Sequence, residues 1–101
     1  MKVITVIEAK EQEAKENNMV LDIRQAEYYQ DYHIPEAVNI PYDKVEEGNY
    51  CLPDEYNYLV YCEHGTQSMT AGRILEADQF QAMPVIGGMT AYYDWMNKQE
   101  K

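Results

Sequence analysis

The sequence predicts an α/β fold in which helices cover a short parallel β-sheet. Short apolar runs of strand length alternate along the chain with longer stretches in which apolar residues have helical spacing. The length of 101 residues is that of one domain, and a hydrophobic content of 46% is sufficient for one compact core. We therefore expect a single domain over residues 1–101, with parallel strands joined by helices.

The expected strands and helices alternate from the N-terminus onward. Strands are expected at residues 2–5, 19–23, 38–40, 58–62 and 83–88. Helices are expected at residues 5–17, 25–32, 43–48, 68–78 and 89–101. Thr5 and Glu8 have the spacing of a capping box at the start of the first helix, and Pro35 interrupts the chain after the second.

The charge of the chain limits the classes of partner. Eighteen acidic residues stand against eight basic ones, which makes the net charge −10. A surface of this charge repels nucleic acid and anionic membranes. Charged residues appear within the first eight positions, where a signal peptide would need an apolar core, and no later stretch is suited to cross a bilayer. We expect a cytoplasmic protein with no nucleic-acid and no membrane partner.

The two cysteines, Cys51 and Cys62, are too few for the disulfide framework of a small secreted domain. Neither has a second cysteine or a histidine pair at the spacing of a zinc site. We therefore expect reduced thiols and no metal. Cys51 lies in a loop, where it is either a bystander or a second thiol that resolves an oxidised Cys62.

Cys62 is the main candidate for a reactive group because it ends the clearest strand, YLVYC, and a polar loop and a helix follow it. Ligands of parallel sheets bind where the carboxyl ends of the strands face a crevice. The N–H groups of residues 63–67 are expected to converge there, and a helix beginning near Ser68 adds the positive end of its dipole. Gly65 permits the tight curl. Thiols in such places have pKa values lowered to roughly 3.5 to 7.5, which would make Cys62 a nucleophile.

Other features of this loop have two interpretations. Thr66 and Ser68 carry hydroxyl groups that can donate hydrogen bonds to the sulfur or to a bound anion. His64 is either an exposed side chain or a group that tunes a nearby thiolate. An alternative is that Cys62 is a buried, unreactive strand residue followed by an ordinary loop. The residue types alone leave these alternatives open.

Three segments match the motifs of one protein family. YCEHGTQS matches its active-site loop at Cys62, Gly65 and Ser68, and IGGMTAYYDW matches a Gly-Gly pair followed by an aromatic residue on the last helix. The segment LDIRQAEYYQDYHIPEAVNIP matches at Asp22, Arg24, Glu27, Tyr28, His33, Ile34, Pro35, Ala37, Asn39, Ile40 and Pro41. With these motifs nearly the whole chain resembles a single-domain rhodanese, a member of the sulfurtransferase family.

The resemblance implies a doubly wound fold around a short parallel sheet, with helices on both faces, and a catalytic Cys62 that carries sulfur as a persulfide. A small sulfur donor or a persulfide-bearing protein would load Cys62, and a thiol or other nucleophile would accept the sulfur, with no metal or organic cofactor. The implied substrate-binding residues form the loop around the persulfide: Glu63, His64, Gly65, Thr66, Gln67 and Ser68.

Three residues near this loop are interpreted as structural. Asp22 and Arg24 end a strand that faces the crevice, where they either touch the substrate or hydrogen-bond the scaffold, and we favour the scaffold. His33 precedes Pro35 in a turn, which favours a packing and hydrogen-bonding role over that of a catalytic base.

The chain departs from the family pattern at the site and at two turns. Gln67 stands where many catalytic members have arginine, and Glu63 stands where a basic residue is frequent; both changes disfavour an anionic donor. Glu36 and Gln79 replace glycines, which predicts strained positions with positive φ.

Two other functions stay open: a non-catalytic rhodanese-like module that binds a partner protein, and a phosphatase or arsenate reductase of the related cysteine-loop type.

Overall fold

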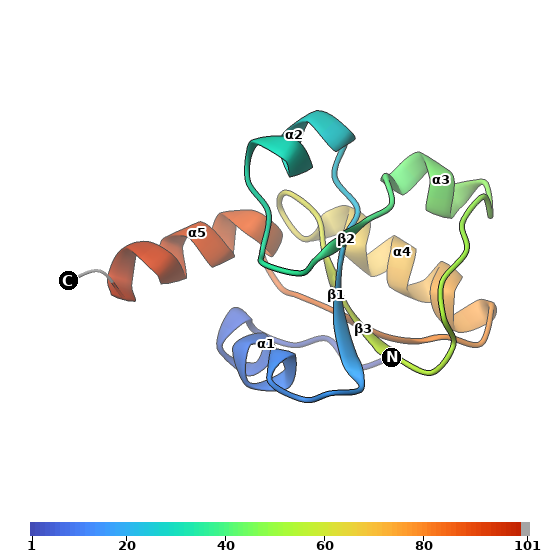
Figure 1. Ribbon diagram of the computed structural model, residues 1–101, viewed down its shortest axis with the longest axis horizontal. Helices are drawn as coiled ribbons and strands as arrows, with labels where there is room; N and C mark the ends of the chain where they lie inside the picture. Colours follow the sequence, from blue (N-terminus) through green and yellow to red (C-terminus); the bar gives the residue numbers. More distant parts are fainter. Residues whose placement is uncertain (100–101) are drawn as a thin grey trace.

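Four parallel strands form the sheet of the protein, in the order β2-β1-β3-β4 (Figure 1). The computed structural model describes residues 1–99. The strands are β1 (Asn18–Asp22), β2 (Val38–Asn39), β3 (Asn57–Tyr61) and β4 (Gln81–Pro84). The helices are α1 (Val6–Glu13), α2 (Ala26–Asp31), α3 (Tyr42–Glu46), α4 (Thr66–Ala77) and α5 (Gly88–Gln99). The predicted α/β architecture with a parallel sheet is thus confirmed.

The central strand β3 divides the apolar core into two halves because successive side chains of a strand point to opposite faces. Leu59 and Tyr61 pack on one face, in a cluster with residues of α1 and α5. Tyr58, Val60 and then Cys62 pack on the other face, in a cluster with residues of α3 and α4. Helices therefore cover both faces of the sheet, as expected, and Cys62 points to the side of α4.

The carboxyl ends of the strands meet at one edge of the sheet, where β1 continues toward α2 and β3 toward α4. Figure 1 shows α2 and the yellow segment between β3 and α4 at the top of the molecule, at this same edge. Strand β1 pairs with β3 from Asn18 opposite Asn57 to Asp22 opposite Tyr61. This register brings the segments that follow Asp22 and Tyr61 side by side, which is where a parallel sheet forms a binding site.

Two of the expected elements are wrong or too long at the N-terminal end of the chain. Residues 2–5 form no strand; Ile4 makes only an isolated bridge to Val85 beside β4. The first helix ends at Glu13 rather than at residue 17; the carbonyl of Gln12 in its last turn accepts hydrogen bonds from Lys15 N–H and from the side chain of Asn18, where β1 begins. The expected capping box is present, with the Thr5 hydroxyl accepting from Glu8 N–H and the Glu8 carboxylate accepting from Thr5 N–H.

Boundaries near the predicted site also shift. The helix after Cys62 begins at Thr66 rather than near Ser68, since the loop takes only three residues to turn. The last strand ends at Pro84, four residues early, because the Gly87–Gly88 turn leads directly into α5. Positions 100–101 of the last expected helix lie outside the described residues. The other strands and helices begin and end within two residues of the predicted positions.

Both positions where glycine is replaced have the strained backbone that the sequence predicts. Glu36 has a φ of 69° and Gln79 a φ of 70°, in the left-handed region that favours glycine. Both side chains are exposed, so no packing of theirs offsets this strain.

Among residues 1–99, no helix combines the length and the apolar character that are needed to cross a membrane.

Candidate active site around Cys62

Cys62 directly follows β3, and its side chain is buried against α4, with a relative exposure of 2%. Two backbone N–H groups donate hydrogen bonds to its sulfur: Gly65 N lies 2.9 Å from Sγ and Ser68 N lies 3.3 Å from it. The sulfur also lies at the N-terminus of α4, the positive end of the helix dipole. Donors and dipole together stabilise negative charge on the sulfur.

The loop between β3 and α4 is tight because Gly65 adopts a left-handed conformation, with φ at 97°. The curl that was predicted at Gly65 is therefore confirmed. The hydroxyl of Ser68 does not donate to the sulfur; it donates to the carbonyl of Gly65, at 2.9 Å. Thr66 and Gln67 are exposed in the first turn of α4. Of the two expected kinds of donor, the described residues provide the sulfur with backbone N–H groups, from Gly65 and Ser68, and not with a hydroxyl group.

Backbone N–H groups that follow the turn at Gly87 and Gly88 donate hydrogen bonds to the Cys62 loop. Met89 N–H donates to the carbonyl of Cys62 at 2.8 Å, and the next N–H, of Thr90, donates to the carbonyl of Glu63 at 3.0 Å. A Cβ atom on Gly88 would lie 2.3 Å from the carbonyl oxygen of Cys62. These two glycines belong to the site, although the sequence marked them only as a family motif; a glycine pair between the last strand and a helix was the available signal.

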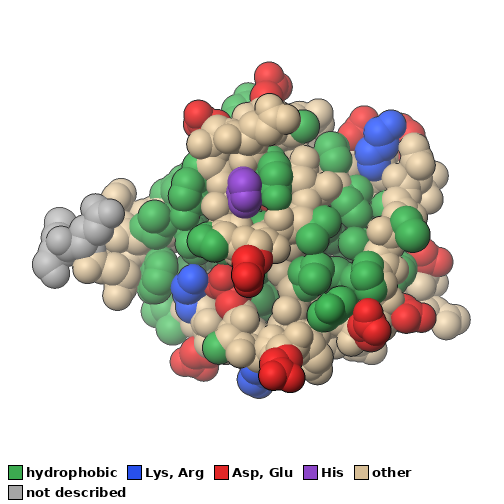
Figure 2. All heavy atoms as spheres, in the orientation of Figure 1, with side chains coloured by type: hydrophobic (Ala, Val, Ile, Leu, Met, Phe, Trp, Pro, Cys, Tyr) green, Lys and Arg blue, Asp and Glu red, His purple; other side chains and the backbone are tan. Residues whose placement is uncertain are grey.

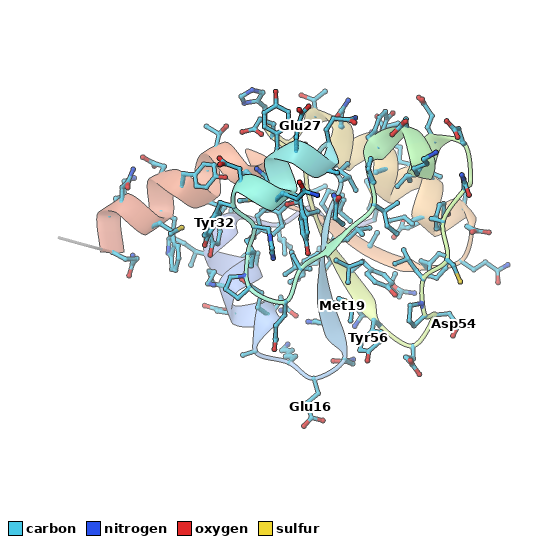
Figure 3. All side chains as sticks on the ribbon, turned by 45° about the horizontal axis from the view of Figure 1, so that its top comes forward. Glu16, Met19, Glu27, Tyr32, Asp54 and Tyr56 are labelled. Atoms are coloured by element: carbon cyan, nitrogen blue, oxygen red, sulfur yellow. The ribbon has the colours of Figure 1, made fainter. Side chains whose placement is uncertain are left out.

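A cleft of about 510 Å³ opens beside the loop, at the carboxyl edge of the sheet. Its lining comes from the segment after β1, from α2, from the Cys62 loop and from α5. Side chains with functional groups in this lining include Arg24, Tyr28, Asp31, Glu63, Gln67 and Tyr93. In Figure 3, the labelled Glu27 and Tyr32 mark α2 and the turn after it, the part of the chain that forms one wall of the cleft.

Arg24 is the cation of this lining, and its guanidinium is held on several sides. Its Nε and Nη2 donate to the two carboxylate oxygens of Asp22, at 3.1 and 2.8 Å, and Nη2 also donates to the carbonyl of Tyr32 at 2.7 Å. Nη1 donates to the hydroxyl of Tyr93 at 3.3 Å and lies 3.8 Å from the carboxylate of Glu63. Burial alone lowers the pKa of Arg24, but the hydrogen bonds and the charge of Asp22 raise it above its ordinary value.

Of the remaining predicted residues, His64 lines the cleft, whereas His33 and Cys51 lie outside its lining. The imidazole of His64 is exposed in the lining, with Nδ1 3.0 Å from the hydroxyl oxygen of Thr90. His33 stacks on the ring of Tyr29, with centroids 3.9 Å apart, and its Nδ1 lies 2.8 Å from the carbonyl of the same residue. Cys51 is exposed in the segment between α3 and β3. The structure thus places His64 in the cleft lining, whereas His33 packs on Tyr29 of α2.

Comparison with known proteins relates the chain to one family. A family model described as the rhodanese-like domain matches residues 5–94. The chain is 29% identical over 92 residues to the thiosulfate sulfurtransferase GlpE of Coxiella burnetii, covering 90% of this chain and 86% of that protein. The crystal structure of a rhodanese-like domain protein from Staphylococcus aureus superimposes with a TM-score of 0.80 at 30% identity, and 91% of each chain is covered.

Some relatives are longer than this chain. The putative sulfur carrier protein YrkF of Bacillus subtilis is 32% identical over 89 residues, which are 87% of this chain but 46% of that protein. The chain therefore spans less than half the length of this relative.

Proposed function

Because the chain belongs to the rhodanese-like domain family, we propose that it is a sulfurtransferase that carries a sulfane sulfur as a persulfide on Cys62. One observation carries this proposal: the Cys62 sulfur accepts two backbone N–H donors at the start of α4, and its neighbours Glu63, His64 and Gln67 line a cleft that opens to solvent. A sulfur in that place is stabilised as an anion, and an anionic sulfur is the nucleophile that sulfur transfer requires.

The proposed reaction has two displacement steps. In the first, the Cys62 thiolate attacks the sulfane sulfur of a donor such as thiosulfate; the S–S bond of the donor breaks, and sulfite leaves with the electron pair. In the second, an acceptor thiolate attacks the outer sulfur of the persulfide, and the electron pair of the broken bond returns to Sγ. The N–H groups of Gly65 and Ser68 stabilise the negative charge of the sulfur before and after transfer.

The charges around the cleft favour a donor that is not a small dianion. Glu63 adds a carboxylate next to Cys62, Gln67 supplies no cation, and Arg24 is already bound by Asp22. We therefore propose a less charged persulfide, or a persulfide on a partner protein, as the natural donor. The relative named as a putative sulfur carrier supports sulfur exchange between proteins in this family.

We place the reaction in the cytoplasm, where thiols such as Cys51 and Cys62 stay reduced.

Mass spectrometry of the intact protein after incubation with excess thiosulfate tests the proposal. We expect a species heavier by one sulfur atom in the wild type and in Cys51→Ser, and its absence in Cys62→Ser. Sulfur loading that survives Cys62→Ser but not Cys51→Ser would show that the nucleophile is assigned to the wrong thiol. If neither the wild type nor any variant becomes loaded, the proposed function is wrong, and the alternative of a non-catalytic binding module takes its place.

A further inference from the structure

The cleft beside Cys62 has an excess of negative charge. Arg24 is its single lysine or arginine in the part of the chain that the structure describes, and the side chain of Arg24 is only 4% exposed. The Asp22 carboxylate, 2.8 Å from its Nη2, balances this charge, although Nη1 also lies 3.8 Å from Glu63. The guanidinium thus has two carboxylates near it, and the cleft lining holds a further one on Asp31, so the negative charge in excess lies on Asp31 and Glu63.

Both carboxylates are accessible to a ligand. The side chain of Glu63 is 42% exposed, and Asp31 is exposed at the end of α2. Figure 2 shows acidic side chains on the surface of α2, at the top of the molecule. Among the described residues Asp31 has no ion-pair partner, and Glu63 has only the 3.8 Å contact with Arg24, so a cation that enters the cleft competes with one long ion pair for these two carboxylates.

Two tyrosine rings complete the same lining. Tyr28 is 54% exposed, and Tyr93 is partly buried with its hydroxyl accepting from Arg24. The faces of tyrosine rings attract ammonium groups, which adds to the attraction of the carboxylates. The volume of about 510 Å³ lies in the range of small-molecule sites.

We propose that this cleft selects small thiols that carry an ammonium group as acceptors of the Cys62 persulfide sulfur. This inference rests on the proposed function, because it names the substrate class of the same site. The ammonium group lies against Asp31 and Glu63, and the thiolate of the same molecule attacks the outer sulfur. A new S–S bond forms in the acceptor, the bond from that sulfur to Sγ breaks, and Cys62 leaves as the thiolate.

Three thiols of similar size test this charge preference. The protein is loaded with excess thiosulfate, freed of it, and discharged with 2-aminoethanethiol, 2-mercaptoethanol or mercaptoacetate, which are cationic, neutral and anionic. Loss of the persulfide is followed by intact mass, and each rate is divided by the thiolate concentration, because the three thiols differ in acidity. We expect the cationic thiol to react about fivefold faster than the neutral one at low salt, with the anionic one slowest.

Variants separate the effect of the cleft from the intrinsic reactivity of the thiols. Asp31→Asn and Glu63→Gln keep the shape of the side chain and remove one negative charge each, so each is expected to lower the ratio of cationic to neutral rates about threefold. Glu27→Gln is the matched control: it removes the same charge from an exposed site on α2 outside the cleft lining, labelled in Figure 3, and its ratio should equal that of the wild type.

The possible failures are distinguishable. A protein that never becomes loaded overturns the proposed function itself. A loaded protein whose ratios of rates are the same in the wild type and in all three variants overturns only the charge selectivity. Equal losses in Glu27→Gln and in the two cleft variants would show that the overall charge of the protein, rather than the cleft, sets the preference.

Discussion

Gly88 lies so close to Cys62 that a Cβ atom at position 88 would be 2.3 Å from the carbonyl oxygen of the nucleophile. The same oxygen accepts a hydrogen bond from Met89 N–H at 2.8 Å. The start of α5 and the end of β3 are therefore in direct backbone contact, and the position of Cys62 depends on the absence of a side chain on a helix that is distant in sequence.

The first prediction is that Gly88→Ala destabilises the protein and slows persulfide loading, because the loop must move to admit the methyl group. Overpacking and the positive φ of 53° together should lower the free energy of unfolding by about 2 to 4 kcal/mol, measured by denaturant titration. Gly48→Ala is the control, since Gly48 has a similar φ of 73° but a Cβ atom there would have no neighbouring atom within 4 Å. It should lose only about 1 kcal/mol and load normally; equal losses in both variants would contradict the role of the contact.

A second prediction concerns the two strained turn residues. Glu36→Gly and Gln79→Gly should each raise the free energy of unfolding by about 0.5 to 1 kcal/mol, because glycine adopts positive φ without the clash of a side chain. Thermal and urea unfolding measure the change. Glu47→Gly serves as the control, since Glu47 has a φ of −76° and glycine there should destabilise the protein. A loss of stability in all three variants would show that the turns hold no strain.

The third prediction concerns the charge at position 67. Gln67→Arg places a cation in the lining of the cleft, so kcat/KM for thiosulfate should rise about tenfold at low salt, through KM, and the gain should shrink as salt is added. Gln81→Arg adds the same charge on an exposed residue at the start of β4, at the opposite edge of the sheet, and should change little. If Gln67→Arg and the wild type have equal kcat/KM at every salt concentration, charge at position 67 does not govern the choice of donor.

A fourth prediction distinguishes sulfur transfer from phosphoryl transfer. Cysteine-dependent phosphatases place five residues between the cysteine and an arginine that binds the phosphate in a bidentate manner. Here four residues separate Cys62 from Gln67, Ser68 follows, and neither is a cation. We expect no hydrolysis of aryl phosphates above background. A phosphatase rate that Cys62→Ser abolishes would overturn the sulfurtransferase proposal.

The sequence predicts those features that depend on neighbouring residues. The alternation of strands and helices, the capping box of Thr5 and Glu8, and the positive φ of Gly65 each follow from local spacing or from the conformational freedom of one residue. The strand expected at residues 2–5 was wrong because only Ile4 pairs there, through an isolated parallel bridge to Val85, and no ladder forms.

Contacts between distant segments were beyond the reach of local patterns. The bond from Arg24 to the hydroxyl of Tyr93 joins residues that are 69 positions apart, and the segment after β1 and α5 must both be in place before it exists. The backbone donors to the Cys62 sulfur could be anticipated as a group, but which N–H groups reach it depends on where α4 begins. The sequence placed that start two residues late, because the N-cap is Gly65, which has no side chain to form the capping hydrogen bond that marks a helix start.

The position of β3 in the sheet has a consequence for how the protein unfolds locally. Strand β3 has a hydrogen-bonded neighbour on each side, whereas β2 and β4 are edge strands. We therefore expect local opening, of the kind that amide hydrogen exchange detects, to begin at the edges and to reach β3 only when the whole fold is lost. Cys62 lies immediately after this central strand, so we expect fraying of either edge to leave the anchor of the nucleophile intact.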